Sequence, residues 1–177
     1  FVDLYPQPVN TPLNGFRYFP KTDYGVLRKP GFFVSVKMFS DQNMDYEILT
    51  GSNPGGHHRS SGFTYISRDG NEIWRNTRNL DGDYDWEHLP GTTSRLDRRP
   101  SNFGNLSKSK FAGGAGSDEN GIMSFQLIPV IDDFKAKKTY FTFDKGFVAL
   151  GSDITSTVKG PNVSTTITQW GTKNIST

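Results

Sequence analysis

The sequence has no cysteine, so its 177 residues cannot be held together by disulfide bonds or by a cysteine-based zinc site. It also has no apolar run approaching the roughly 20 residues that a helix needs to cross a bilayer. Charge of either sign is not in excess, because 20 Lys and Arg against 18 Asp and Glu give a net charge of only +2. Proteins that bind nucleic acid through a basic field carry much more. We therefore expect neither nucleic acid nor a membrane as a partner.

The sequence further lacks any long segment with the 3.6-residue apolar period of a helix. Aromatic residues make up 14% of it, and 19 glycines with 10 prolines indicate many turns. This composition is typical of loop-rich all-β proteins. It is also typical of carbohydrate-binding surfaces, because the apolar faces of sugar rings stack on aromatic side chains. We predict a single antiparallel all-β domain, a β-sandwich of stacked sheets.

The positions of the prolines and the alternation of apolar with polar residues predict the order of the elements along the chain. Half of the prolines fall in residues 1–30, which we interpret as an extended lead-in along the surface of a sandwich domain over residues 31–177. Residues 75–120 are predicted to be mostly irregular, and a loop this long suggests a functional role. "KAKK" (135–138) is interpreted as a strand entry with outward lysines that discourage edge pairing. The expected strands span residues 31–40, 45–49, 63–67, 72–74, 122–130, 138–144, 146–154 and 164–170.

The stretch "DYDWEHLPGTTSR" (83–95) combines aromatic, acidic and basic residues around a turn. Pro90-Gly91 predicts a tight turn, and the two threonines that follow can bond its free backbone groups. Trp86 can either cover this turn as part of the core or offer its ring to a sugar. We favour a structural role for the turn itself.

The histidines have both an ordinary and a functional interpretation. His57 and His58 are adjacent in a loop, and neighbouring side chains of an extended segment point apart, so we expect exposed histidines and no metal site. The alternative is that His58 or Arg59 contacts an acidic sugar. His88, inside the turn segment, is expected to be a packed, hydrogen-bonded structural residue.

A basic cluster follows the turn. Arg95, Arg98 and Arg99 suit the carboxylate and sulfate groups of acidic sugars, because a guanidinium can form two parallel hydrogen bonds with either group. The equally weighted alternative is a solvated surface run. Arg28 is a similar candidate.

Several segments occur in the order in which one enzyme family carries them. On these segments the chain resembles the central β-domain of polysaccharide lyase family 8, which includes hyaluronate, chondroitin and xanthan lyases. The most specific parts are "WEHLPGTT" and "AKKTYFTFDKGFVALGSDI". The segments are "YGVLRKPGFFVSVKMFS", "DYEILTGSN", "GFTYISRDG", "WEHLPGTT", "FAGG", "ENGIMSFQL", "FKAKKTYFTFDKGFVALGSDI" and "VSTTITQ".

The resemblance implies a super-sandwich akin to galactose mutarotase and a catalytic α/α-toroid domain that this chain does not contain. It further implies a secreted or periplasmic enzyme that cleaves acidic, uronate-containing polysaccharides by β-elimination. No cofactor is expected, and a divalent cation is left open. The isolated chain is expected to be inactive, since the toroid of the family carries the catalytic Asn, His and Tyr.

The resemblance also assigns individual residues. Glu47 falls where the β-domain of the family lends a glutamate to the cleft, and it would position and tune a toroid side chain. From the residues alone, the favoured interpretation of Glu47 is a solvated carboxylate at a strand end, and the resemblance favours the functional role. The family often has a second acid shortly after, and here Asn53 ends a stretch that lacks it. The predicted substrate contacts are Arg28, Asn53, His58, Arg59, Trp86 and Arg95.

Two other functions fit the same composition. One is a non-catalytic carbohydrate-binding or adhesive β-sandwich, which the density of aromatic residues favours. The other is a purely structural sandwich that orients neighbouring domains and has no affinity for sugars.

Overall fold

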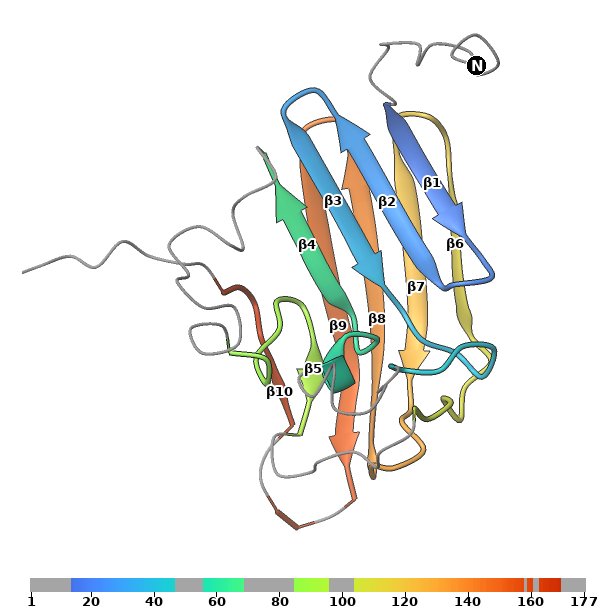
Figure 1. The fold of residues 1–177 in the computed structure, drawn as a ribbon, viewed down its shortest axis with the longest axis vertical. Coiled ribbons are helices and arrows are strands. Elements are labelled where there is room, and N and C mark those ends of the chain that lie inside the picture. The colour runs from blue at the N-terminus through green and yellow to red at the C-terminus, as the bar shows by residue number, and fades with distance from the viewer. Residues whose placement is uncertain are drawn as a thin grey trace, which may run out of the picture.

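The computed structural model describes residues 14–46, 56–68, 85–95, 104–157, 159–160 and 163–169. Within them the fold is two four-stranded antiparallel sheets packed face to face (Figure 1). The first sheet has the order β1 (Gly15–Phe19), β2 (Tyr24–Lys29), β3 (Phe32–Lys37) and β4 (Phe63–Ser67). The second has the order β6 (Ala112–Gly116), β7 (Gly121–Leu127), β8 (Phe134–Phe143) and β9 (Gly146–Ser156). A 3-10 helix, η1 (Gly56–His58), precedes β4, and β5 (Thr93–Ser94) pairs with β10 (Ser164–Thr165).

The core lies between the two sheets. Period-two alternation puts one side of each strand inward, so that Val34 and Val36 of β3 meet Met123 and Phe125 of β7, all four fully buried. The sheets approach closely where glycine replaces a side chain. A Cβ on Gly25 would lie only 1.9 Å from the sulfur of Met123. The all-β sandwich predicted from the sequence is therefore confirmed.

Residues 15–29 correct the predicted lead-in. They form β1 and β2, which pair over their whole length, so the interpretation of residues 1–30 as a surface segment is wrong there. The two prolines among the described residues of this stretch, Pro20 and Pro30, lie in turns after β1 and β2 instead. Pro30 and Gly31 form the two-residue turn from β2 to β3, and Gly31 has a φ of 71°, as the third residue of a type II turn requires.

Two further expectations are corrected in the second sheet. The glycine-rich stretch within residues 111–121 contains β6, a strand of glycine and alanine only. Gly114 lets it fit against Tyr18, which a Cβ at that position would meet at 2.7 Å. Lys138 is not outward: it shares the inner face of β8 with Ala136 and Tyr140 and is 4% exposed. Lys135 and Lys137 do point outward.

The remaining strand predictions divide into three groups. Those for residues 31–40, 63–67, 122–130, 138–144 and 146–154 are confirmed by β3, β4, β7, β8 and β9. The strand expected over 164–170 is limited to β10, and the strand 72–74 and residues 47–49 lie outside the described residues. No helix in the part of the chain that the structure describes is long and apolar enough to cross a membrane.

Candidate functional site

The turn at Pro90-Gly91 is built mainly from its own backbone. Gly91 has a φ of 78°, in the left-handed region that favours glycine, and a Cβ there would lie 2.3 Å from Thr64 Oγ1. The Thr92 hydroxyl donates to the carbonyl of Leu89 at 2.7 Å, and the Thr92 N–H donates to the same oxygen at 3.1 Å. The structural interpretation of this turn is confirmed.

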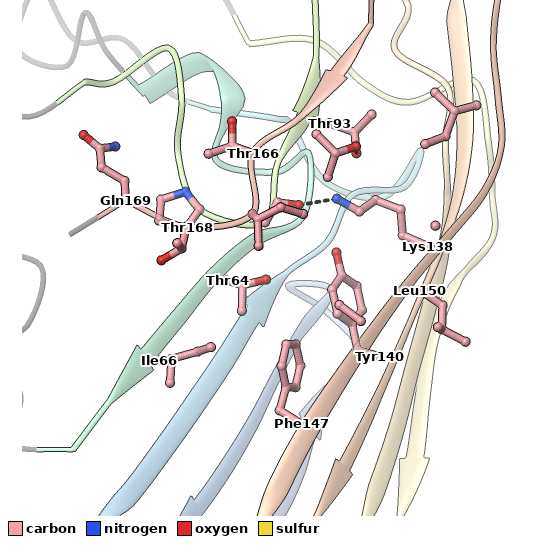
Figure 2. A pocket seen from close by; sticks show the side chains of 17 residues that line it. Thr64, Ile66, Thr93, Lys138, Tyr140, Phe147, Leu150, Thr166, Thr168 and Gln169 are labelled. Carbon is pink, nitrogen blue, oxygen red and sulfur yellow. Dashed lines mark hydrogen bonds between the residues drawn. The ribbon is translucent and has the colours of Figure 1, made fainter.

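The turn also ties several strands together. Pro90 O accepts from the N–H of Thr64 in β4 at 2.8 Å, and the Gly91 N–H donates to Thr166 O, just after β10, at 2.7 Å. From the opposite sheet, the Lys138 ammonium donates to Gly91 O (Figure 2). The turn therefore joins both sheets and the small β5–β10 pair.

A cavity of about 670 Å³ lies beneath the turn, between the inner face of β4 and strands β8 and β9 (Figure 2). Its lining is mostly apolar side chains and threonines, with Lys138 as its cation. Burial lowers the pKa of Lys138 to about 7 and raises that of the neighbouring Tyr140 phenol. Lys138 also donates to Ser61 O at 3.3 Å, so the amine links two backbone carbonyls.

On the other side of the segment 85–95, two histidines meet one glutamate. His57 and His58 end η1, each is 8% exposed, and their ring centroids are 4.2 Å apart. The Nε2 atoms of His57 and His58 lie 3.2 Å and 3.4 Å from the same oxygen of Glu87, Oε2. Burial, and then the charge of His57, lower the pKa of His58 to about 4, so its ring is neutral at neutral pH.

The prediction of exposed loop histidines is therefore wrong. It assumed an extended backbone, in which adjacent side chains diverge, whereas the tight turn of η1 brings both rings to Glu87. The premise that excluded a metal site at adjacent histidines fails for the same reason. His88 is hydrogen-bonded as predicted, with Nδ1 2.6 Å from Asp85 Oδ2, but its side chain is 44% exposed and not packed.

Arg59 and Trp86 form a surface pair beside this cluster. The guanidinium carbon of Arg59 lies 5.4 Å from the centre of the Trp86 ring, a cation–π distance. Trp86 is half-buried and packs on Leu89 together with Phe63 and Tyr65 of β4. Trp86 thus covers the turn, and Arg59 holds a positive charge over its ring.

Arg28 belongs to the same outer face of the first sheet. It is exposed and lies opposite Phe33 across the β2–β3 ladder, and the Phe33 ring meets that of Tyr65 edge-on at 5.8 Å. Because Tyr65 also packs with Trp86 in the Leu89 cluster, the candidates Arg28 and Trp86 share one face. We call this aromatic and basic surface, made by Arg28, Phe33, Arg59, Tyr65 and Trp86, the outer face.

Arg95 lies inside the molecule. It is 2% exposed, its Nε is 3.8 Å from Asp132 Oδ1, and it donates to the hydroxyl of Ser156 at 3.3 Å. The interpretation as a solvated surface run is wrong for this residue, because its guanidinium pairs with a buried carboxylate. The neighbouring arginines of that run, Arg98 and Arg99, lie outside the described residues, as do the candidates Glu47 and Asn53.

Three residues of the site were not predicted. Glu87 is inside the turn segment, but its histidine partners are 30 positions away, and no local pattern points to them. Lys138 could have been found, because strict alternation from Tyr140 and Ala136 places it on the inner face. Asp45 is held by the N–H groups of Asn105 and Tyr46, and burial raises its pKa to about 6.

Comparisons with known proteins identify the class of this sandwich. Residues 14–175 match the polysaccharide lyase family 8, super-sandwich domain. Chondroitinase-AC of Pedobacter heparinus is 32% identical over 83% of this chain and 21% of its own length, and chondroitin sulfate ABC endolyase of Proteus vulgaris is 27% identical over 92% and 17%. The structure of chondroitinase AC lyase in enzyme–oligosaccharide complexes superposes with a TM-score of 0.78 at 31% identity, covering 88% of this chain and 23% of that one.

Fold and sequence together define a super-sandwich domain of the polysaccharide lyase type. The chain belongs to polysaccharide lyase family 8. It spans about a fifth of the length of the curated relatives it matches.

Proposed function

We propose that this chain is the β-domain of a lyase that cleaves uronic-acid-containing polysaccharides of the hyaluronan or chondroitin type by β-elimination. In this proposal it lends cleft residues to a catalytic helical domain outside the chain. The observation that carries the proposal is the family match over residues 14–175. The polymer substrate implies a secreted or periplasmic enzyme.

The chemistry explains why the chain alone should be inactive. In β-elimination a base removes the proton at C5 of the uronate, the C–H electron pair becomes the C4–C5 double bond, and O4 leaves with a proton from an acid. The substrate carboxylate must also be neutralised. The outer face offers cations and ring faces that can hold the polymer. In this proposal the base and the acid belong to the helical domain, as the resemblance to the family implies.

The outer face supports a role in holding the polymer. Arg28 and Arg59 suit carboxylate or sulfate groups, and Trp86 suits the apolar face of a sugar ring. Cations and aromatic rings on one surface are the combination that an acidic polysaccharide requires. The same surface would serve a non-catalytic binding module, which differs by having no catalytic domain beside it.

The other residues predicted for the site differ in how well the structure agrees with a role at the cleft. Glu47 and Asn53 follow the buried Tyr46 in the chain, and we propose that Glu47 positions a catalytic side chain of the helical domain. His58 and Arg95 are buried, which disfavours direct contact with a polymer, so for these two a contact with sugar stays only a prediction from the sequence.

The test is a lyase assay on the parent protein and on this chain, side by side. The ultraviolet absorbance of unsaturated uronate is followed with hyaluronan, chondroitin sulfates and xanthan. We expect activity in the parent, none in the chain, and a loss of about a hundredfold or more in kcat for a Glu47→Gln parent. An active parent indifferent to Glu47→Gln would remove the role of Glu47. Inactivity on every uronate polymer would favour the binding module.

A matched pair of variants tests the outer face. In the parent, Arg59→Ala should raise KM, because it removes a cation that meets the polymer. Lys137→Ala, on the outward side of the second sheet and paired with Asp153, should leave KM unchanged. Equal effects of the two variants would contradict the outer face as the binding surface.

A further inference from the structure

We propose that His57, His58 and Glu87 form a binding site for a first-row divalent transition-metal ion of the zinc class, which clamps η1 to the segment 85–95. The ligating atoms of these three residues all lie within 4.8 Å of one another. This inference does not rest on the lyase activity, because none of its evidence involves the polysaccharide.

The distances between the ligating atoms match a metal centre. Zinc binds imidazole nitrogen and carboxylate oxygen at about 2.0–2.1 Å, so two ligands of a tetrahedral ion lie about 3.3 Å apart. The observed distances from Glu87 Oε2 are 3.2 Å to His57 Nε2 and 3.4 Å to His58 Nε2. Each nitrogen is therefore already at the spacing from the carboxylate oxygen that a shared ion requires, and all three ligating atoms lie within 4.8 Å of one another.

A buried nitrogen without a well-aligned hydrogen bond points to a missing ligand. The His58 side chain is 11% exposed, and its Nε2 lies 3.4 Å from Glu87 Oε2 but makes no well-aligned hydrogen bond with any described residue. Buried polar atoms are satisfied in nearly all native structures, and each exception needs an explanation. A bound ion would supply the partner of this nitrogen and would also neutralise the carboxylate.

The donor set selects the kind of ion. Two imidazoles and one carboxylate suit zinc and its first-row neighbours, whereas calcium and magnesium require oxygen ligands. Three protein ligands leave one position for water, as in zinc sites that keep an open coordination position. The Glu87 side chain is 39% exposed, so the ion has a route from solvent. A cavity of about 30 Å³ lined by both histidines has room for a water molecule.

The surroundings of the cluster are compatible with a cation. The same small cavity is bordered by the carboxylates of Asp45 and Asp132, while Arg95 is paired with Asp132. Arg59 is directed to the Trp86 ring. An ion held here would connect two segments 30 positions apart in the sequence and would reinforce the packing of Trp86 and Leu89 on β4.

The experiment uses the 177-residue chain freed of metal with a chelator. Zinc(II) binding is followed by native mass spectrometry and thermal unfolding, and cobalt(II) binding by visible absorption. We expect one ion per chain, a melting temperature that rises with zinc concentration, and the intense cobalt bands of a four-coordinate site. Glu87→Gln, at a half-exposed position that should tolerate the change, is expected to weaken binding by about tenfold or more.

The chain has only three histidines, so His88 supplies an internal control. His88→Ala should bind zinc like the unaltered chain. If a His58→Ala variant does not fold, imidazole NMR signals of the unaltered chain decide instead: zinc should move those of His57 and His58 and leave those of His88. The proposal is overturned if zinc does not bind, if Glu87→Gln and His88→Ala bind equally well, or if only the His88 signals move.

Discussion

The two halves of the segment 85–95 have different roles. One half holds the fold together, and the other contributes side chains to the molecular surface. From Leu89 onward the chain is buried, and backbone hydrogen bonds and the Lys138 amine fix it to both sheets. From Asp85 to His88 the side chains are at least partly exposed: Glu87 meets the histidines of η1, and His88 meets Asp85. We conclude that the buried half sets the position of the exposed half. Substitutions in the two halves should therefore have different consequences.

Gly91→Ala should have the largest effect on stability. The residue needs a φ of 78°, and a Cβ would lie 2.3 Å from Thr64 Oγ1 and 2.7 Å from Gly62 O. We expect a loss of about 3 kcal/mol or more in the free energy of unfolding, measured by urea denaturation. Gly113→Ala is the matched control, because nothing lies within 4 Å of its Cβ position. Similar losses in both variants would contradict the role of the turn.

Thr92→Val should come next. It keeps the shape of a fully buried side chain but removes the hydroxyl that donates to Leu89 O at 2.7 Å. The expected loss is about 0.5–1.5 kcal/mol, the usual net contribution of one hydrogen bond, because the Thr92 N–H still donates to Leu89 O. Thr22→Val, which removes an exposed hydroxyl bonded to Phe19 O, should cost much less in the same denaturation experiment.

Lys138 should make stability depend on pH in a defined window. Burial lowers its folded pKa to about 7, below the ordinary value of 10.5, so the unfolded chain binds more protons between these values. Stability should therefore rise as the pH increases from about 7 towards 10.5, and fall as it decreases through the same range. Urea denaturation at several pH values checks this. A Lys138→Met variant should lose most of that slope, and an unchanged slope would show that another group causes it.

His88→Ala should have the smallest effect, because the residue lies in the exposed half. Its contact with Asp85 is 2.6 Å long, but both side chains are about half exposed, and such pairs contribute little. We expect a change within about 0.5 kcal/mol in the free energy of unfolding. A loss as large as that of Thr92→Val would mean that the exposed half also holds the fold.

Sequence patterns predicted the sheets better than the site. Alternation in β3 and β7 reflects burial on one face, which is a local property, so Val34 and Met123 reveal their strands without any knowledge of partners. The prediction of a lead-in up to Pro30 was wrong because proline fits both an extended surface segment and a hairpin turn. The turn at Pro90-Gly91 was predictable because the residues that form it are neighbours in the sequence.

The histidine cluster and Arg95 could not be predicted in this way. His57 and His58 are buried only because Glu87 and its segment fold over them, and Arg95 is buried because Asp132 lies within 4 Å of it. These pairings cross long stretches of sequence, and the polar residue types alone favour exposure. The outer face is similar, since Arg28 belongs to β2 whereas Arg59 and Trp86 reach that face from the residue after η1 and from the segment 85–95.

The most direct test of the account compares Arg59→Ala with Thr92→Val in the parent protein, measuring lyase kcat/KM and melting temperature for each. The account predicts that Arg59→Ala lowers kcat/KM by about tenfold with little change in melting temperature. It predicts that Thr92→Val lowers the melting temperature by several degrees and leaves kcat/KM nearly unchanged below the transition. If Arg59→Ala left kcat/KM intact, or if both variants changed the same quantity, the separation between an outer face that binds the polymer and a buried turn that holds the fold would be contradicted.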